Sequence, residues 1–300
     1  KTGEVLALVS TPSYDSMDYI LGLSQEQLDA LNNDEAQPLY NRFRQAWVPG
    51  SSFKPVIGAI GLSTGTLTAD EDLGASGLSW QKDSSWGDYY VTTLHEYSGA
   101  ADLRNALVYS DNIYFAKAAL QIGADTLAGQ LDKLGFNQEI PFEISMTSSQ
   151  YSNTEGIDTE IQLADSGYGQ GQILVNPLHL ACIYSAFFNE GNMIAPYLEY
   201  EEGKTASYWI EDAFTPEAAQ TIYEDLQEVV SDPGGTGHDA ASVSGVTLAG
   251  KTGTAEIKES QDDTEGTELG WFAVYNTGAS DEDTVLMLNM VEDVKGRGGS

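Results

Sequence analysis

The sequence predicts an α/β fold of the α+β type, in which one discontinuous α/β lobe carries an inserted, mostly helical lobe. Strand-like runs occur at the start of the chain and three times near its end, and the stretch between them is mainly helical. We therefore expect a single domain whose α/β lobe comprises residues 1–50 and 215–300 and whose helical lobe comprises residues 51–214. The chain has 300 residues, 41% of them hydrophobic, which is ample for a large core.

The predicted elements begin with a strand and a short helix. Residues 5–10 (VLALVS) form an apolar run typical of a strand, and the turn-rich segment TPSYDSMD follows. Ser24 and Gln27 have the spacing of a capping box, in which each side chain bonds the backbone N–H of the other residue. A helix is therefore expected to begin just after Ser24.

Helical patterns dominate the middle of the chain. Residues 102–123 and 124–136 are two such stretches. Asn176 and Pro177 open a third, because asparagine is a favoured N-cap and proline fits the first helical position.

A further helix is predicted to start at Thr215 and Pro216 and to stop at the DPGG turn of residues 232–235. Apolar side chains recur along it at helical spacing, at Ala219, Ile222, Tyr223, Leu226, Val229 and Val230. Such a stripe is typical of a helix that packs on a core.

Three strand-like runs close the chain, at residues 246–256, 270–275 and 284–291. The polar connections QDDTEG and NTGASDED between them are typical of hairpins. With the run at residues 5–10, these segments predict the sheet of the α/β lobe.

The composition excludes several functions. Asp and Glu outnumber Lys and Arg by 46 to 13, which gives a net charge of −33. So acidic a chain repels nucleic acid and anionic lipid, and we expect neither as a partner. No stretch reaches the roughly 18 apolar residues of a membrane helix, and no signal peptide precedes the first strand.

Metal, cofactor and thiol chemistry are not expected. The single cysteine, Cys182, excludes an internal disulfide, and its apolar surroundings favour a small buried side chain over a reactive thiol. His95, His179 and His238 lack the spacing of metal ligands, so structural or surface roles are favoured for all three.

The stretch WVPGSSFKP combines a turn with a candidate nucleophile. Pro49 and Gly50 make the turn, and Ser51 starts an apolar helical run. Lys54 lies three residues on, where side chains share a helix face, so its amine can reach the Ser51 hydroxyl. Burial and a second cation would lower the pKa of this lysine, as a general base requires. Taken alone, however, the pattern is more typical of an ordinary helix start than of a catalytic site, because serine is a common N-cap.

The triplet SDN lies in the middle of a helical stretch. Ser110 and Asn112 would interrupt the helix there, because serine and asparagine compete for backbone hydrogen bonds. In isolation the triplet is more typical of a turn between two helices or of an exposed polar face than of a catalytic site.

The segment AGKTGTAE lies on a predicted strand. Alternation places Lys251 and Gly253 on one face and Thr252 and Thr254 on the other. The glycine would let a ligand approach the backbone closely. The segment is not a phosphate loop, because no glycine-rich spacing precedes the lysine and no helix follows. A glycine-punctuated edge strand without a functional role is the alternative.

Together the three patterns occur in the order SxxK, SxN, KTG, the motif set of penicillin-binding proteins and serine β-lactamases. The chain resembles the transpeptidase domain of a class B penicillin-binding protein. PGSSFKP is similar to the family's PGS-x-F-K-P, YSDNIYFAK to its SxN region and AGKTGTAE to its third motif. Residues 167–191, GWFAVY and VKGRGGS resemble further family segments, so the resemblance runs over nearly the whole chain. It implies the penicillin-binding-protein and serine β-lactamase fold, with an antiparallel sheet flanked by helices and an inserted all-helical lobe.

The resemblance also implies catalytic roles. Ser51 would attack the substrate carbonyl and Lys54 would take its proton. Ser110 would relay a proton to the leaving group, with the positive charge of Lys251 close by. Asn112 would bond the backbone amide of the substrate.

Substrate binding is implied for the third motif. The hydroxyls of Thr252 and Thr254 would hold the terminal carboxylate, with Gly253 between them. The backbone N–H groups of Ser51 and Thr254 would form the oxyanion hole.

The implied activity is that of a serine D,D-transpeptidase, which cross-links peptidoglycan stem peptides through an acyl-enzyme and is acylated by β-lactams. A serine β-lactamase, a D,D-carboxypeptidase and a non-catalytic β-lactam sensor remain alternatives. No glutamate motif of class A lactamases follows the SDN triplet, and class D enzymes carry a valine where Asn112 stands.

The family also implies a location at the extracytoplasmic face of the bacterial membrane, with a membrane glycosyltransferase and division or elongation proteins as partners. The amino-terminal anchor and accessory domain of the family, and the helix that usually closes its sheet, do not occur in this sequence. We therefore expect this chain by itself to be a soluble part of a longer protein.

Overall fold

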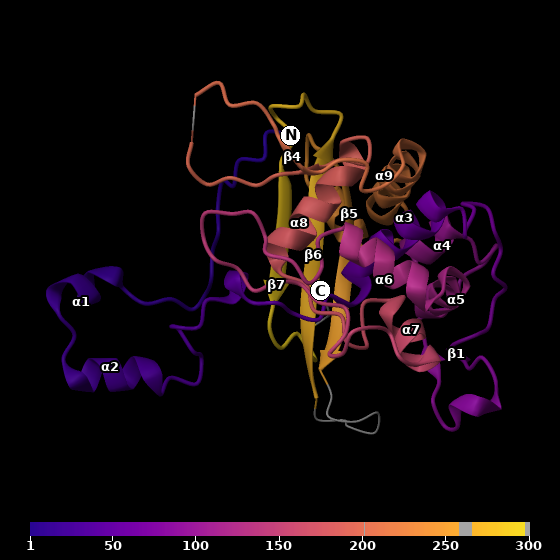
Figure 1. The fold of residues 1–300 in the computed structure, drawn as a ribbon, viewed down its shortest axis with the longest axis horizontal. Coiled ribbons are helices and arrows are strands. Elements are labelled where there is room, and N and C mark those ends of the chain that lie inside the picture. Colours follow the sequence, from indigo (N-terminus) through magenta and orange to yellow (C-terminus); the bar gives the residue numbers. More distant parts are fainter. Residues whose placement is uncertain (201, 258–265, 298–300) are drawn as a thin grey trace.

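The computed structural model describes residues 1–200, 202–257 and 266–297. Within these residues the helices are α1 (Ser16–Leu21), α2 (Gln25–Asn32), α3 (Lys54–Thr64), α4 (Leu103–Val108), α5 (Asn112–Ile122), α6 (Ala124–Lys133), α7 (Glu160–Ser166), α8 (Pro177–Ser185) and α9 (Pro216–Ser231). The strands are β1 (Ser79–Trp80), β2 (Val91–Thr92), β3 (Met193–Ile194), β4 (Tyr208–Ile210), β5 (Thr247–Ile257), β6 (Thr267–Thr277) and β7 (Leu286–Val291). The fold is therefore mixed α/β, as predicted (Figure 1).

The main sheet is antiparallel, with strand order β5-β6-β7. Its register pairs Gly253 with Trp271 and Trp271 with Met290. The three strands predicted near the end of the chain are thereby confirmed. The predicted connection QDDTEG lies almost wholly outside the described residues, whereas NTGASDED joins β6 to β7 as predicted.

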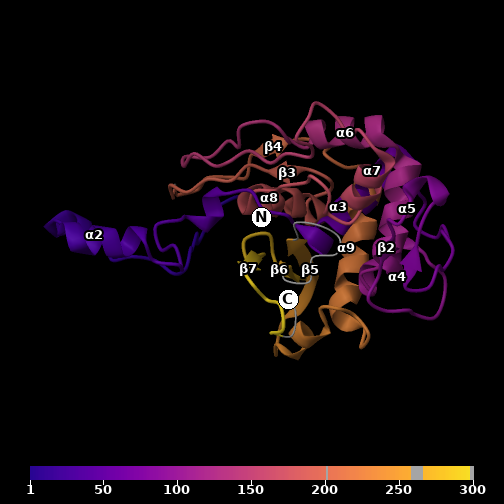
Figure 2. The same cartoon turned by 90° about the horizontal axis from the view of Figure 1, so that it is seen from below.

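Helices pack on this sheet and on one another. α9 packs along β5 and α8 packs against β7, while α3 contacts both α5 and α9 (Figure 2). The sequence assigned α8 to the helical lobe, yet it lies on the sheet. The division into lobes at residue 215 stays a prediction.

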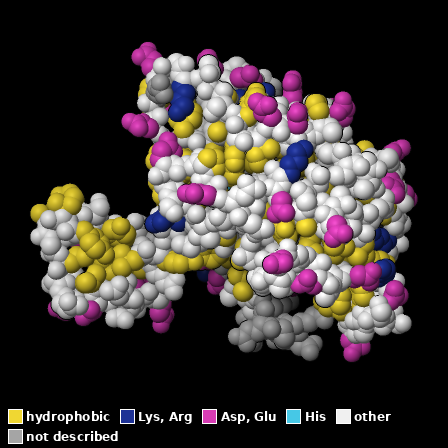
Figure 3. Space-filling model, viewed as in Figure 1, with side chains coloured by type: hydrophobic (Ala, Val, Ile, Leu, Met, Phe, Trp, Pro, Cys, Tyr) yellow, Lys and Arg dark blue, Asp and Glu magenta, His cyan; other side chains and the backbone are white. Residues whose placement is uncertain are grey.

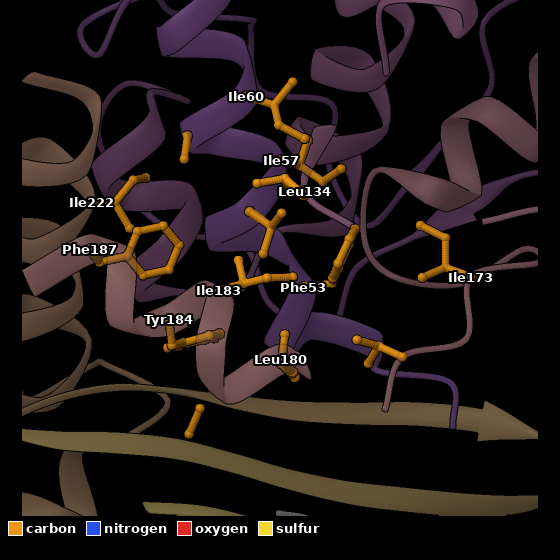
Figure 4. Close-up of a cluster of buried hydrophobic side chains, with 14 of the residues drawn as sticks. Phe53, Ile57, Ile60, Leu134, Ile173, Leu180, Ile183, Tyr184, Phe187 and Ile222 are labelled. Carbon is orange, nitrogen blue, oxygen red and sulfur yellow. The ribbon is translucent and has the colours of Figure 1, made fainter. Parts of the chain in front are cut away.

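The core is centred where α3, α8 and α9 meet (Figure 4). Phe53, Ile57 and Ile60 enter it from the α3 side, and Ile183 and Ile222 are supplied by the other two helices, all with no exposed surface. α3 is apolar nearly all round, and its first eight residues are buried, which is typical of a helix at the centre of a domain.

Three predicted helix starts are confirmed by their capping hydrogen bonds. Ser24 and Gln27 form a complete capping box at α2. Asn176 and Thr215 cap α8 and α9, and in both helices a proline follows the cap.

The strand predicted at residues 5–10 is wrong. Only an isolated bridge between Glu4 and Tyr197 forms there, and the following residues have no regular structure. Leu6 and Val9 are 71% and 74% exposed, so these side chains of the apolar run do not pack on a sheet. Hydrophobic sequence alone does not supply the neighbouring strand that hydrogen bonds require.

After this segment the chain leaves the body of the molecule. α1 and α2 lie in a projecting arm, at the left of Figure 1, and neither helix has a buried residue. None of the helices in the described parts of the chain is long and apolar enough to cross a lipid bilayer.

Candidate active site

Ser51 lies in a tight 3₁₀ turn, Gly50–Phe53, that leads directly into α3. Gly50 has φ +54°, and its N–H donates to the Gly169 carbonyl at 2.9 Å. A Cβ atom at Gly50 would lie 2.3 Å from the Thr254 carbonyl oxygen, so only glycine lets the turn pack this closely on β5. The sequence PGSSFK thus fixes a turn whose serine is only partly buried.

Hydrogen bonds from three sides hold this turn. The Ser52 hydroxyl donates to the Pro49 carbonyl at 2.8 Å, and the Tyr184 hydroxyl donates to the Ser52 carbonyl at 2.7 Å. The Trp271 indole N–H donates to the Val48 carbonyl at 2.9 Å. Ser51 is therefore carried on backbone anchored to α8 and β6, which suits a residue that must keep one position.

Lys54 points from the first turn of α3 toward Ser110. Its side chain has no exposed surface, and its Nζ donates to the Ser110 carbonyl at 2.6 Å and to the Ser110 hydroxyl at 3.0 Å. No hydrogen bond joins Lys54 to Ser51 among the described residues, although the helical spacing predicted that the amine could reach the serine. In this structure Lys54 is thus held by the second motif.

Ser110 occupies the corner between α4 and α5, as the predicted helix interruption requires. It has φ +57°, the left-handed region that serine rarely adopts. The cap of α5 is Asp111, whose Oδ1 accepts from the backbone N–H groups of Ile113 and Tyr114. Its Oδ2 accepts from the Tyr97 hydroxyl at 2.9 Å. Asp111 was not among the predicted site residues, although an acid before an apolar helical run is an N-cap signal.

Lys251 approaches the same serine from β5. Its side chain has no exposed surface, and its Nζ donates to the Ser110 hydroxyl at 3.0 Å and to the Thr252 carbonyl at 3.1 Å. A third, longer bond of 3.4 Å reaches the hydroxyl of Thr236, which also accepts from Thr252 at 2.9 Å. Thr236 was missed by the sequence analysis, and its signal would have been the glycine-flanked GGTG loop after α9.

Both lysines have lowered pKa values. Burial lowers the pKa of Lys251 to about 7. Burial is also the main cause that lowers the pKa of Lys54, the positive charge of Lys251 lowers it further, and Asp111 partly opposes both. The site can therefore hold an uncharged lysine near neutral pH, which is the form that accepts a proton.

The faces of β5 agree with the predicted alternation. Lys251 and Gly253 are buried, and Thr252 and Thr254 are partly exposed. A Cβ atom at Gly253 would lie 2.7 Å from the Ser52 nitrogen, so the missing side chain makes room for the serine turn. The approach of a ligand to this glycine stays a prediction.

Asn112 begins α5, and its side-chain amide donates to the Thr92 carbonyl in β2 at 2.8 Å. This bond turns the residue toward the short β1–β2 hairpin. Its contact with a substrate amide stays a prediction.

The remaining candidates for chemistry are structural. His179 is fully buried between the Ser149 hydroxyl at 2.7 Å and the Leu134 carbonyl at 2.8 Å, and burial lowers its pKa to about 4. Cys182 is buried, which raises its thiol pKa to about 12 and confirms the inert role predicted for it. In the described part of the chain no three His, Cys, Asp or Glu side chains are grouped to hold a metal ion.

Three motifs from distant parts of the chain thus meet at one serine hydroxyl, and the whole sequence matches a known family. Residues 1–300 match the family described as penicillin binding protein transpeptidase domain. The chain belongs to this family. The resemblance stated from its motifs is thereby confirmed.

Named relatives agree with this assignment. Penicillin-binding protein 3 of Bacillus subtilis is 45% identical over all 300 residues, and the peptidoglycan D,D-transpeptidase MrdA of Haemophilus influenzae is 27% identical. The chain covers 44% of the first protein and 49% of the second, so it spans about half the length of these relatives.

Solved structures show the same fold. Penicillin-binding protein A of Mycobacterium tuberculosis, in a ceftriaxone acyl-enzyme complex, superposes with a TM-score of 0.80 at 23% identity, over the whole chain and 67% of that protein. The D,D-transpeptidase domain of a peptidoglycan glycosyltransferase from Eggerthella lenta gives a TM-score of 0.75 at 24% identity, over 97% of this chain and 70% of that one.

Proposed function

We propose that this domain is a serine D,D-transpeptidase that cross-links peptidoglycan stem peptides. The observation that carries the proposal is the pair of buried lysines that donate to the one hydroxyl of Ser110, beside the anchored turn of Ser51. The name of one relative, the peptidoglycan D,D-transpeptidase MrdA, points to the same reaction.

The first half-reaction is acylation. The Ser51 oxygen attacks the carbonyl carbon between the two terminal D-alanines of a stem peptide, and its proton passes to the uncharged amine of Lys54. When the tetrahedral intermediate collapses, the C–N bond breaks and the departing amine of D-alanine takes a proton from the Ser110 hydroxyl. That hydroxyl regains a proton from Lys54, with which it already shares a hydrogen bond of 3.0 Å.

The second half-reaction reverses these steps with another nucleophile. An amine of a neighbouring stem peptide attacks the ester carbonyl, and the bond to Ser51 breaks as the new amide forms. The attacking amine loses a proton to Ser110, and the departing oxygen of Ser51 takes a proton from Lys54, which regains one from Ser110. A β-lactam would enter the first half-reaction only, because its ring-opened product keeps the leaving group tethered.

Substrate binding is assigned to the exposed face of β5. The hydroxyls of Thr252 and Thr254 hold the terminal carboxylate, and the positive charge of Lys251 attracts it. The backbone N–H groups of Ser51 and Thr254 stabilise the oxyanion, and loss of one such donor typically costs about 10²–10³ in rate. The close packing of Gly50 on Thr254 supports this arrangement, because it holds the two segments side by side.

A serine β-lactamase would also need a group to activate the deacylating water, such as the glutamate of class A enzymes. Asp111 is the acid whose charge acts on Lys54, and helix capping and Tyr97 already occupy its oxygens. This favours a long-lived acyl-enzyme. A D,D-carboxypeptidase or a β-lactam sensor would use the same residues, so turnover with an amine acceptor separates them from a transpeptidase.

We further propose that the full protein acts at the extracytoplasmic face of the bacterial membrane. Its substrate is located there, and the family resemblance gives a membrane glycosyltransferase and division or elongation proteins as partners. No nucleic acid is expected at a chain with a net charge of −33.

The test is the intact mass of the protein after incubation with benzylpenicillin. We expect an adduct of the mass of the drug that persists for hours and is lost in Ser51→Ala. Ser84→Ala, which removes an exposed serine hydroxyl outside the three motifs, serves as the control and should acylate normally. Hydrolysis of the drug without an adduct would instead establish a lactamase. Formation of an amide between a D-Ala-D-Ala peptide and an added amine, with release of D-alanine, would establish transpeptidation.

A further inference from the structure

A second, smaller hydrophobic cluster lies beside the main core. Its buried members come from the β1–β2 hairpin, α5 and α7, and they are Trp86, Val91, Ile113, Ala116 and Ala164. The cluster therefore joins the hairpin that bonds Asn112, the helix that begins at Asn112, and the helix that leads into the GYGQG turn of residues 167–171. Figure 1 shows β1, α5 and α7 together at the right of the molecule.

Asp165 lies at the polar edge of this cluster. Its Oδ1 accepts from the hydroxyls of two tyrosines, Tyr89 of the hairpin at 2.5 Å and Tyr168 of the GYGQG turn. The rings of both tyrosines pack against the cluster. Many acidic side chains are spread over the surface in Figure 3, where water solvates them, whereas Asp165 is partly buried between two phenols. This carboxylate therefore ties the hairpin to the turn.

The GYGQG turn contacts the backbone that carries Ser51. The Gly169 carbonyl accepts from the Gly50 N–H at 2.9 Å, and a Cβ atom at Gly169 would lie 2.1 Å from the Gly50 carbonyl oxygen. The Tyr168 N–H donates to the Asp165 carbonyl at 3.2 Å, so Asp165 holds the turn with its backbone as well as with its carboxylate. A shift of Tyr168 would therefore be transmitted to the residue that precedes Ser51.

The hairpin contacts the second motif. The Thr92 carbonyl in β2 accepts from the side-chain amide of Asn112 at 2.8 Å. The hairpin has a second tie to α7, the pair of Lys82 with Glu160, but both side chains are exposed and such pairs contribute little. The partly buried bond of Tyr89 is therefore the one that we expect to fix the hairpin near β2.

We propose that Asp165 is a positioning residue that fixes Ser51 relative to Asn112. It acts on Ser51 through Tyr168 and on Asn112 through Tyr89. The inference rests on the proposed function, in which Ser51 attacks the substrate and Asn112 bonds one of its backbone amides. Groups on separate elements need such support, because a displacement of about 1 Å can cost about 100-fold in rate.

The two tyrosines are tested separately through acylation by benzylpenicillin, followed by rapid-quench mass spectrometry at a series of drug concentrations. Tyr168→Phe releases the turn next to Ser51, so we expect the maximum rate to fall by about 10–100-fold. Tyr89→Phe releases the hairpin beside Asn112, which weakens one hydrogen bond to the bound drug. We expect the half-saturating concentration to rise by about 2–10-fold, with little change in the maximum rate.

Tyr151→Phe is the matched control. It removes the hydroxyl of another tyrosine that donates to a carboxylate, that of Asp132, at 3.3 Å. The maximum rate and the half-saturating concentration should both equal those of the parent. Thermal unfolding checks that every variant is folded at the temperature of the measurement.

A double-mutant cycle tests whether both tyrosines act through Asp165. Asp165→Ala should combine the two effects, and adding Tyr89→Phe or Tyr168→Phe to it should change acylation no further, since the shared acceptor is already gone. Asp165→Asn keeps an acceptor oxygen and should restore most of the activity. A contribution to folding alone would lower the unfolding temperature without this pattern. The two single tyrosine variants decide the proposal if Asp165→Ala does not fold.

Acylation like that of the parent in both tyrosine variants would overturn the proposal. Undiminished further losses on the Asp165→Ala background would also overturn it, because the tyrosines would then act independently of the carboxylate. Either outcome leaves the proposed function intact, since the parent is still acylated. A parent that benzylpenicillin does not acylate would instead remove the proposed function and, with it, the role of Asp165.

Discussion

Lys54 and Lys251 each place their Nζ 3.0 Å from a single oxygen, the hydroxyl of Ser110. Two buried ammonium groups at this spacing repel each other, and burial already disfavours the charge on each. The pKa values of both lysines are lowered, so a lysine that holds Ser110 can be uncharged near neutral pH and can act as a base.

Removal of the Ser110 hydroxyl, which Lys54 and Lys251 share, tests whether this hydroxyl relays a proton during acylation. Ser110→Ala leaves both lysines without their common partner, and we expect the rate of acylation by benzylpenicillin to fall by about 10²–10⁴, the usual contribution of a positioned acid or base. The rate is measured by stopped-flow fluorescence or by time-resolved mass spectrometry. Ser84→Ala is the matched control, and an unchanged rate in Ser110→Ala would exclude the proton relay.

The pH dependence of acylation tests the coupling of the two lysines. A base must be uncharged, so the rate should rise with pH through the pKa of Lys54 and level off well below 10.5, its ordinary value. In Lys251→Met the neighbouring positive charge is absent, which raises the pKa of Lys54 and moves the rise to higher pH. The profile of each protein is measured at saturating drug. If the acylation rate rose at the same pH in both proteins, the charge of Lys251 would not be a cause of the lowered pKa of Lys54.

The packing of β5 on the serine turn is tested by Gly253→Ala. The added methyl would lie 2.7 Å from the Ser52 nitrogen and 3.0 Å from the Pro49 carbonyl oxygen, both backbone atoms that cannot rotate away. We expect a loss of about 1–3 kcal/mol in the free energy of unfolding, as for other overpacked sites, together with slower acylation. Gly129→Ala, in α6, meets nothing within 4 Å and is the matched control, with an expected gain of about 0.5–1 kcal/mol. Equal stability of the two variants would contradict this account of Gly253.

Asp225 in α9 gives a prediction about stability and pH. It is buried, its Oδ2 has no hydrogen-bond partner among the described residues, and burial raises its pKa to about 7 from the ordinary 3.8. The folded protein therefore binds a proton that the unfolded chain releases between pH 3.8 and 7, and the free energy of unfolding falls as the pH rises through this window.

Asp225→Asn removes this cost, because asparagine is uncharged at every pH. At pH 8 we expect the variant to unfold at a higher urea concentration than the parent, with a free energy of unfolding that is larger by about 1–3 kcal/mol. At pH 4.5 we expect most of this difference to be lost. Asp239→Asn, at an exposed position, is the control. An advantage that is constant between the two pH values would assign the effect to packing rather than to charge.

Helix caps and helix ends could be predicted from the sequence. The capping box of Ser24 and Gln27, the N-caps Asn176 and Thr215, and the helix interruption at Ser110 all depend on residues close in the chain, and each has the predicted form. The strand predicted at residues 5–10 failed because a strand needs hydrogen bonds from a distant neighbour, which an apolar run does not provide.

By itself, the sequence determined the family and its three motifs, because the order SxxK, SxN, KTG is a property of the chain. Only the tertiary structure decided which side chains meet. It brings Lys54 and Lys251 to Ser110 across 56 and 141 residues, adds Thr236 and Asp111, and holds Lys54 by Ser110 rather than by Ser51. The lowered pKa values also come from the folded state, since both have burial as their first cause, and burial is produced by packing rather than by spacing.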